Sequence, residues 1–332
     1  MGGGAWSTNV YDAAASYRAS TGASAFAYSD RMRGAAGGMK IHPSLDPKGV
    51  RVRESRDSDE HPTSLAISVL FDVTGSMGSV PRELQAKLPS LFGLLLRKGY
   101  VEHPQIMFGA IGDATCDRVP LQVGQFESDN RMDEQLGNII LEGGGGGQVM
   151  ESYELAMYFM ARHTVLDCFE KRGKKGYLFV IGDEKPYKKV DAHQVKDVIG
   201  DKLRVGIPTK EIIEELERSF HVFFIIPAGA AHAGSREILD AWRALLGERV
   251  IELDDQGLAC ETIALTIGIL EDSIDLDEGL DDLRDLGADV AVAPVGKALA
   301  GLRPDVPRPG ALTAGPSGRP PVRRDGTGIA RL

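Results

Sequence analysis

An unbroken apolar run sets the strongest limit on what this chain can fold into. Residues 65–71 read Leu-Ala-Ile-Ser-Val-Leu-Phe, in which Ser68 is the only polar side chain. A strand with one solvent-facing side would alternate polar and apolar residues, so this run predicts a parallel strand buried on both faces. Covering both faces requires helices on either side of the sheet, which predicts an α/β fold.

Further strands and helices alternate along the chain after this run. Apolar runs predict strands over residues 106–111, 177–181, 221–226 and 250–253, and helical patterns cover residues 131–140, 149–160, 209–219, 235–246 and 257–270. This alternation predicts a doubly wound, mostly parallel sheet with right-handed crossovers and helices on both faces. Residues 119–126 follow the preceding strand too closely for a crossover helix, which predicts one antiparallel edge strand. A leucine-rich helical pattern follows Pro81, and Pro89 should kink or divide that helix.

The composition predicts one large domain with extensions at both ends. Residues 1–61 are rich in Gly, Ala and Ser without a sustained period, and they form an N-terminal extension. Their scattered aromatic side chains either pin this extension to the main domain or to a partner, or belong to a partly disordered arm. The main domain covers residues 62–271, and residues 272–302 form an acidic helical segment. Residues 303–332 are dominated by Pro, Gly and Arg, which predicts a disordered tail.

The net charge of -10 argues against general binding to nucleic acid or to an anionic membrane surface. No apolar segment approaches the ~20 residues of a membrane span, and the N-terminus does not resemble an export signal. Cys116, Cys168 and Cys260 are widely separated, which favours neither a disulfide framework nor a zinc cluster. We therefore expect a cytoplasmic protein.

Hydroxyl and carboxylate side chains follow the first predicted strand. Asp72, Thr74 and Ser76 are spaced i, i+2 and i+4 in a loop, which can bring three oxygens to one point. Asp183 follows the strand at residues 177–181, and open α/β sheets bind ligands beyond the carboxyl ends of their strands. Mg²⁺ takes oxygen ligands with one or two direct carboxylates, so these four residues predict a Mg²⁺ site, with Mn²⁺ or Ca²⁺ as alternatives. The competing interpretation is a strand-to-helix turn capped by hydroxyl groups.

The same residues resemble the metal-ion-dependent adhesion site of von Willebrand factor A domains. The segment Asp72-Val73-Thr74-Gly75-Ser76-Met77 is similar to the family's Asp-x-Ser/Thr-x-Ser loop, and Asp183 stands where the family has a further Asp. The resemblance covers residues 62–271 and is to bacterial cytoplasmic members. It implies a scaffold or adaptor that binds a protein through Mg²⁺ and does not catalyse a reaction. It also implies a partner that supplies an acidic residue to the metal, with an AAA+ ATPase assembly as one candidate.

The glycine-rich loop departs from the family pattern. Many family members have Gly-Gly-Thr before a helix, whereas here Gly143–Gly147 is followed by Gln148-Val149-Met150-Glu151-Ser152. Because some members use an acidic residue at this position, the resemblance makes Glu151 the candidate ligand, with Ser152 and Gln148 as alternatives. Asp113 follows the second predicted strand, and it is either a water-mediated or outer contributor to the site or the cap of a turn.

An enzyme is the alternative to a binding protein. Phosphotransferases with an aspartate nucleophile also place an Asp at the tip of the first strand, near Mg²⁺, which would make Asp72 the nucleophile. Enzymes of the haloacid dehalogenase type have a second acid two residues later, where this chain has Thr74. Lys185 could assist such chemistry, although Pro186 beside it favours a simple turn. A scaffold with an inert domain is a third interpretation.

Overall fold

A six-stranded sheet forms the centre of the computed structural model, which describes residues 4–35, 38–144, 147 and 149–302. Its strands are β2 (Leu65–Asp72), β3 (Pro104–Ile111), β4 (Leu121–Val123), β7 (Gly176–Ile181), β11 (Phe220–Pro227) and β12 (Val250–Leu253). They lie in the order β12-β11-β7-β2-β3-β4. All neighbours are parallel except β4, which runs antiparallel to β3.

The apolar run at residues 65–71 lies at the heart of this sheet. All eight residues of β2 are buried, and the strand pairs with β3 on one side and β7 on the other. A strand so placed has no solvent-facing side, as its unbroken apolar run predicts. The α/β fold is therefore confirmed, and β4 is the predicted antiparallel edge strand.

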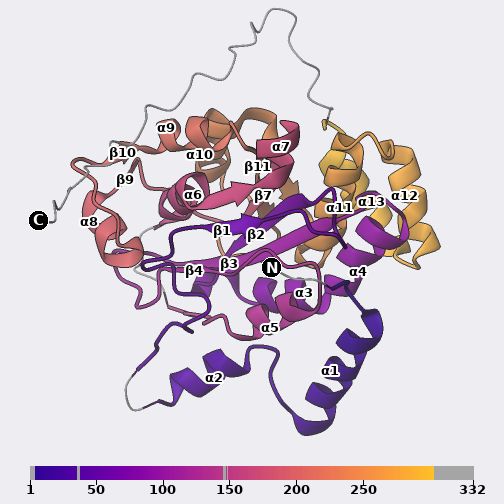
Figure 1. Cartoon of the computed structure of the whole chain (residues 1–332), viewed down its shortest axis with the longest axis horizontal. Coiled ribbons are helices and arrows are strands. Elements are labelled where there is room, and N and C mark those ends of the chain that lie inside the picture. Colours follow the sequence, from indigo (N-terminus) through magenta and orange to yellow (C-terminus); the bar gives the residue numbers. More distant parts are fainter. Residues whose placement is uncertain (1–3, 36–37, 145–146, 148, 303–332) are drawn as a thin grey trace, which may run out of the picture.

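Helices cover both faces of the sheet. They are α3 (Val80–Ala86), α4 (Leu88–Phe92), the π-helical turn η2 (Gly93–Arg97), α5 (Arg131–Gly137), α6 (Tyr153–Arg162), α7 (Asp167–Arg172), α9 (Thr209–Leu216), α10 (Arg236–Leu246) and α11 (Ala259–Leu270). The β2–β3 and β7–β11 connections run in opposite directions along the sheet, so right-handed crossovers place them on opposite faces. In Figure 1, α6, α9 and α10 lie above the sheet, and α3 and α5 lie below it. The helix after Pro81 is divided at Lys87, as the position of Pro89 predicts.

Short elements complete the domain around the sheet. The two-stranded pairs are β1 (Arg53–Ser55) with β6 (Thr164–Leu166), β5 (Met150–Glu151) with β8 (Lys185–Pro186), and β9 (Lys189–Val190) with β10 (Ile207–Pro208). The short helices are η1 (Gly75–Met77), α8 (Ala192–Gln194), η3 (Val195–Ile199), η4 (Gly247–Arg249) and η5 (Gln256–Leu258). The helix expected over residues 149–160 begins only at Tyr153, because β5 occupies its first residues.

The N-terminal segment forms two helices that the sequence pattern does not predict. They are α1 (Thr8–Thr21) and α2 (Ala27–Arg33). The start of α1 is capped by Ser7, which accepts a hydrogen bond from the Val10 amide, and its end is capped by Gly22 in a left-handed conformation with φ 68°. Only Tyr11 of α1 is buried, so no apolar stripe of helical period marks the helix in the sequence.

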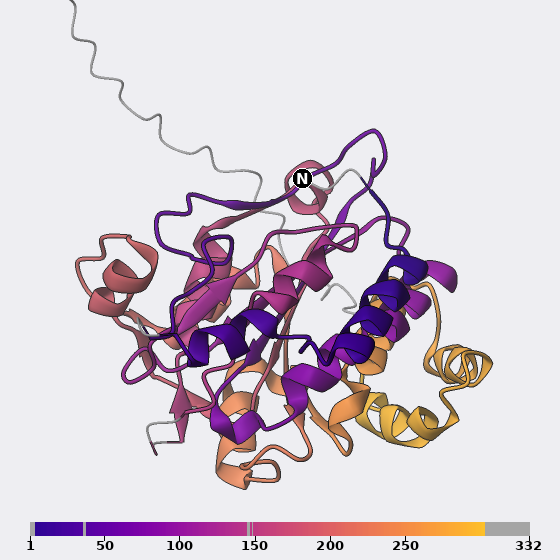
Figure 2. The same cartoon turned by 90° about the horizontal axis from the view of Figure 1, so that it is seen from below.

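Aromatic side chains hold this segment against the domain. Phe26 is completely buried, and the Trp6 ring stacks on Phe92 of α4 with ring centroids 4.3 Å apart. Figure 2 shows α1 and α2, in indigo, lying across one side of the molecule beside the purple helices of the following segment. Trp6, Tyr11 and Phe26 therefore belong to the same core as the sheet.

The acidic C-terminal segment is helical. It contains α12 (Leu276–Asp285) and α13 (Asp289–Leu299), which pack against α11. Asp275 and Glu278 form a capping box at the start of α12. Among the helices that the structure describes, none combines the length and the apolarity of a membrane span. The tail predicted for residues 303–332 lies outside the described residues.

Candidate functional site

Three acidic residues from the predicted site lie at the carboxyl edge of the sheet. Asp72 is the last residue of β2, Asp113 stands two residues after β3, and Asp183 stands two residues after β7. The connection after β2 leads to β3 on one side of the sheet, and the connection after β7 leads to β11 on the other side. The strand order therefore reverses between the parallel strands β2 and β7. Loops diverge at such a switch point and leave room for a ligand.

The loop after β2 is organised by the Asp72 carboxylate. Asp72 Oδ1 accepts hydrogen bonds from the Thr74 amide at 2.8 Å and from the Thr74 hydroxyl at 2.6 Å. The Thr74 and Ser76 hydroxyl oxygens lie 3.2 Å apart. The i, i+2, i+4 spacing therefore brings the three side chains together as the sequence predicts.

Asp183 joins this loop from the neighbouring strand. The Ser76 hydroxyl donates to Asp183 Oδ1 at 2.8 Å, and the His232 amide donates to Asp183 Oδ2 at 2.8 Å. The backbone of the loop after β11 also contacts Ser76, whose carbonyl accepts from the Ala231 amide at 2.9 Å. Loops after three adjacent strands thus meet at Ser76, through its hydroxyl for Asp183 and through its backbone carbonyl for Ala231.

The glycine-rich loop lies directly against Gly75. The Gly75 amide donates to the Gly144 carbonyl at 2.7 Å, and the Gly143 amide donates to the Val73 carbonyl at 3.2 Å. A Cβ at Gly75 would lie 3.2 Å from the carbonyl oxygens of Gly143 and Gly144, so a side chain at position 75 would require the glycine-rich loop to shift.

Tyr153, at the start of α6, contacts the same carboxylate. Its hydroxyl donates to Asp72 Oδ2 at 2.9 Å, so both Asp72 oxygens have partners. Tyr153 comes so close to β7 that a Cβ at Gly182 would lie 2.1 Å from the Tyr153 hydroxyl oxygen. Position 182 must therefore be glycine for this contact to form.

Two more buried carboxyl groups lie beside Asp72. The β5–β8 pair brings together Glu151, which is 2% exposed, and Glu184, which is 6% exposed. One oxygen of each, Glu151 Oε2 and Glu184 Oε2, is buried without a hydrogen-bond partner. The other Glu184 oxygen lies 3.5 Å from His232 Nε2. Unpaired buried carboxyl oxygens carry a large desolvation cost, which a bound cation would offset.

The crowding of acids changes their pKa values. Burial raises the pKa of Asp72 to about 7, against the lowering effect of the Thr74 hydrogen bonds. Burial, together with the charge of Asp72, raises the pKa of Glu151 to about 10 and that of Glu184 to about 8. Carboxyl groups with raised pKa values keep their protons at higher pH than ordinary carboxyl groups do. A divalent cation bound beside them would compete with these protons.

Asp113 makes a separate set of contacts. Its carboxylate accepts hydrogen bonds from the Thr115 amide at 2.8 Å, the Thr115 hydroxyl at 2.7 Å and the Tyr187 hydroxyl at 2.9 Å. Ser152, an alternative ligand from the sequence, accepts from the Ala114 amide at 2.9 Å. Asp113 thus organises its own turn and the position of Tyr187. Gln148, the other alternative ligand, lies outside the described residues.

The hydroxyl pair fits an octahedral Mg²⁺. Adjacent ligands on such an ion, bound at ~2.1 Å, lie ~3.0 Å apart, and the Thr74 and Ser76 oxygens lie 3.2 Å apart. Within the described ranges, no three His, Cys, Asp or Glu side chains converge as a metal-binding group. The set formed by Asp72, Thr74, Ser76 and Asp183 is of another type, because half of its members are hydroxyl residues.

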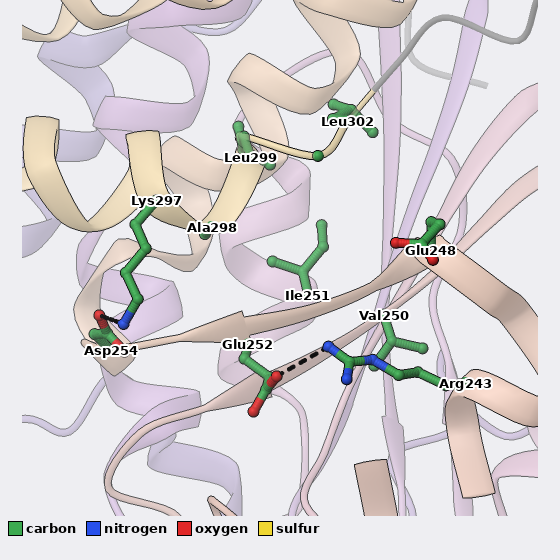
Figure 3. A pocket seen from close by; sticks show the side chains of 11 residues that line it. Arg243, Glu248, Val250, Ile251, Glu252, Asp254, Lys297, Ala298, Leu299 and Leu302 are labelled. Carbon is green, nitrogen blue, oxygen red and sulfur yellow. Dashed lines mark hydrogen bonds and ion pairs between the residues drawn. The ribbon is translucent and has the colours of Figure 1, made fainter. Parts of the chain in front are cut away.

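A separate hollow of about 280 Å³ lies between β12 and α13. Four of its charged side chains form two pairs, with Arg243 bonded to Glu252 at 3.2 Å and Lys297 bonded to Asp254 at 2.6 Å (Figure 3). β12 is the sheet edge three strands from β2, so this hollow is not part of the Asp72 site.

Sequence reasoning missed Tyr153, Glu184 and His232 at the site. The helical period of residues 149–160 predicts a core position for Tyr153, and its ring is buried there. The only sequence signal for Glu184 is its position next to Asp183. His232 takes part through its backbone amide as well as its ring, and a backbone contact leaves no signal in residue type.

No model of a known protein family matches the chain, and no curated protein matches it. Among solved structures, the pilus adhesin SpaC from Lactobacillus rhamnosus GG, in its open conformation, is 9% identical with a TM-score of 0.44, over 67% of this chain and 31% of the adhesin. Proximal thread matrix protein 1 from the mussel byssus is 10% identical with a TM-score of 0.41, over 62% of this chain and 48% of that protein. The matched region thus spans less than half of either protein.

Proposed function

We propose that this chain is a von Willebrand factor A-type domain that binds a partner protein through Mg²⁺ held by Asp72, Thr74, Ser76 and Asp183. The observation that carries the proposal is the continuous series of contacts from Asp72 through the Thr74 and Ser76 hydroxyls to Asp183. This series joins the loops after β2 and β7 at the switch point of the sheet. Two hydroxyls and two carboxylates are a ligand set that suits Mg²⁺.

The neighbouring acids support the presence of a cation. Glu151 and Glu184 each keep an unpaired oxygen in a buried position beside Asp72. Glu151 is the acid that we assign to the glycine-rich loop of the site, and Asp113 contributes from outside by ordering Tyr187 and Ser152. Mn²⁺ or Ca²⁺ would satisfy the same oxygens.

The open side of the site lies at Gly75 and Ser76. Asp72 and Asp183 are completely buried, whereas Ser76 is half-buried and Gly75 is exposed. Mg²⁺ bound there would offer a Lewis-acidic position to an incoming carboxylate. We therefore infer a protein partner with an acidic side chain, and an adaptor or scaffold role in a cytoplasmic assembly such as one built around an AAA+ ATPase.

The phosphotransferase alternative has less support. A nucleophilic Asp72 needs a free carboxylate oxygen facing a substrate, but Asp72 is 0% exposed and both of its oxygens accept hydrogen bonds. Lys185, the lysine considered for such chemistry, is paired with Glu237 on α10. These contacts suit a carboxylate that orders a loop better than one that attacks a phosphoester.

Calorimetric titration with MgCl₂ and MnCl₂ tests the proposal. The unaltered protein should bind one ion, and Ser76→Ala and Asp72→Asn should each weaken binding at least tenfold while keeping the fold. Asp240→Asn, at an exposed position of α10, is the matched control and should bind like the unaltered protein. Equal metal binding by the unaltered protein and both site variants would show that the site is wrongly assigned.

A further inference from the structure

Two histidines face each other at the opposite edge of the sheet. His61 comes shortly before β2 and His103 directly before β3, so both lie near the amino ends of these paired strands. Their Nδ1 atoms lie 3.4 Å apart, and their rings meet edge to face with centroids 5.4 Å apart. His61 is 9% exposed, and His103 is half-buried.

The N-terminal segment fixes the tautomer of His61. His61 Nε2 lies 2.8 Å from the Gly4 carbonyl oxygen, which also accepts from the Ser128 hydroxyl at 2.7 Å. A carbonyl oxygen only accepts hydrogen bonds, so the ring proton of neutral His61 must be on Nε2. Nδ1 therefore presents its lone pair to His103. A ring nitrogen held to a backbone carbonyl in this way is the usual arrangement of a metal-binding histidine.

The distance between the two nitrogens is compatible with a metal ion bound to both. A direct N–H···N hydrogen bond would be expected at roughly 2.7–3.2 Å, by analogy with other N–H donors, which is shorter than the 3.4 Å observed. Two imidazole nitrogens bound at ~2.05 Å to one tetrahedral ion lie ~3.3 Å apart. The observed separation is close to the edge of a tetrahedral metal site.

We propose that His61 and His103 bind a divalent transition-metal ion of the zinc type through their Nδ1 atoms. No third His, Cys, Asp or Glu side chain of the described residues joins them, so water would complete the coordination. Such an ion would link the starts of β2 and β3 and, through His61 and Gly4, the beginning of the chain. This site takes nitrogen ligands, and it is independent of the oxygen site at Asp72.

Zinc titration of the full chain tests this site, with Mg²⁺ present in millimolar excess to occupy the Asp72 site. Zinc should bind the unaltered protein with a stoichiometry of one and raise its melting temperature. His103→Ala should weaken zinc binding at least tenfold and abolish the zinc-dependent rise. His61→Gln keeps a donor for the Gly4 carbonyl but lacks the ring nitrogen, so it should lose zinc binding while melting like the unaltered protein without zinc.

Two control variants separate this site from other zinc ligands. Cys116→Ser removes the exposed thiol, and His193→Ala removes a histidine of α8. Both should bind zinc like the unaltered protein. Zinc uptake that is unchanged in His103→Ala and His61→Gln, or uptake that is lost in Cys116→Ser, would overturn the proposal and leave the two histidines as a packed pair without a metal.

Discussion

The Tyr153 hydroxyl connects the helical core to the candidate Mg²⁺ site. The ring is fully buried and packs edge to face against Phe224 and Trp242, with centroids 5.4 Å away in both cases. The same side chain donates its proton to Asp72. Because aromatic packing leaves the ring little freedom, it holds the Asp72 carboxylate in the orientation that the Thr74 contacts require.

Replacing Tyr153 with phenylalanine should damage the site without opening a cavity. The Asp72 Oδ2 atom would lose its partner while still buried, and leaving such an acceptor unsatisfied costs about 1–3 kcal/mol. We expect Tyr153→Phe to lower the free energy of unfolding by about this amount when measured in chelator, and to weaken Mg²⁺ binding. Tyr158→Phe, on the same helix, removes a hydroxyl that bonds to the partly exposed Asp201 and should leave Mg²⁺ binding unchanged.

Asp57 should make the stability of the fold depend on pH. Burial alone would raise the pKa of Asp57, but hydrogen bonds from Arg172, Ser64 and Lys171 hold this pKa below its usual range. A lowered pKa in the folded state stabilises the fold above the unfolded value of ~3.9, and this contribution is lost as pH falls toward the folded value. Asp57→Asn should therefore lower the free energy of unfolding by about 1 kcal/mol at pH 7.

Denaturant titrations at pH 7 and at pH 3 measure this effect. The difference between Asp57→Asn and the unaltered protein should narrow at pH 3, because the Asp57 carboxyl then gains a proton in the unfolded chain while the folded protein still keeps it charged. Asp59→Asn, at an exposed neighbouring position, serves as the control with a small difference at both pH values. A constant difference for Asp57→Asn would mean that its ion pairs do not stabilise the fold.

At the scale of elements, the N-terminal helices act as part of the domain core. Phe26 is 0% exposed and lies at the start of α2, and the Ser29 hydroxyl of that helix accepts from the Leu141 amide at 3.0 Å. Truncating a buried phenylalanine to alanine costs about 3–5 kcal/mol. We expect Phe26→Ala to reduce the free energy of unfolding by about this amount, whereas Tyr17→Ala, at a side chain that is 67% exposed, should change it little. Equal unfolding curves for these two variants would show that α2 is not docked in solution.

The elements divide into those that the sequence predicts and those that it does not. β2 and β7 are predictable because strands buried on both faces need uninterrupted apolar runs, and Pro89 marks the break in its helix because it lacks an amide proton. The pair β5–β8 has two residues in each strand, too few to show any period. Its position, and with it the approach of Glu184 to Glu151, depends on tertiary packing. The loop from Asp72 to Ser76 is predictable because its geometry is local.

At the scale of the whole molecule, β2 connects the two candidate metal sites. Asp72 ends this strand of eight residues, and the amide of its first residue, Leu65, donates to the His103 carbonyl at 2.9 Å. At ~3.3 Å per residue the ends of the strand are ~23 Å apart. This separation exceeds the Debye length of ~8 Å at physiological ionic strength. The two sites also use different ligands, oxygen at one edge and imidazole nitrogen at the other.

The two sites should therefore behave independently. Sites more than ~10 Å apart without shared partners usually contribute additively, within ~0.5 kcal/mol. We expect His103→Ala to change Mg²⁺ affinity less than about twofold, and Ser76→Ala to leave the zinc-dependent rise in melting temperature intact, since neither side chain contacts the other site. Calorimetry and thermal melting on both single variants and on the double variant measure the coupling. If His103→Ala weakens Mg²⁺ binding as much as Ser76→Ala does, while its metal-free melting temperature is unchanged, then β2 transmits a conformational change between the two edges of the sheet and the sites are coupled.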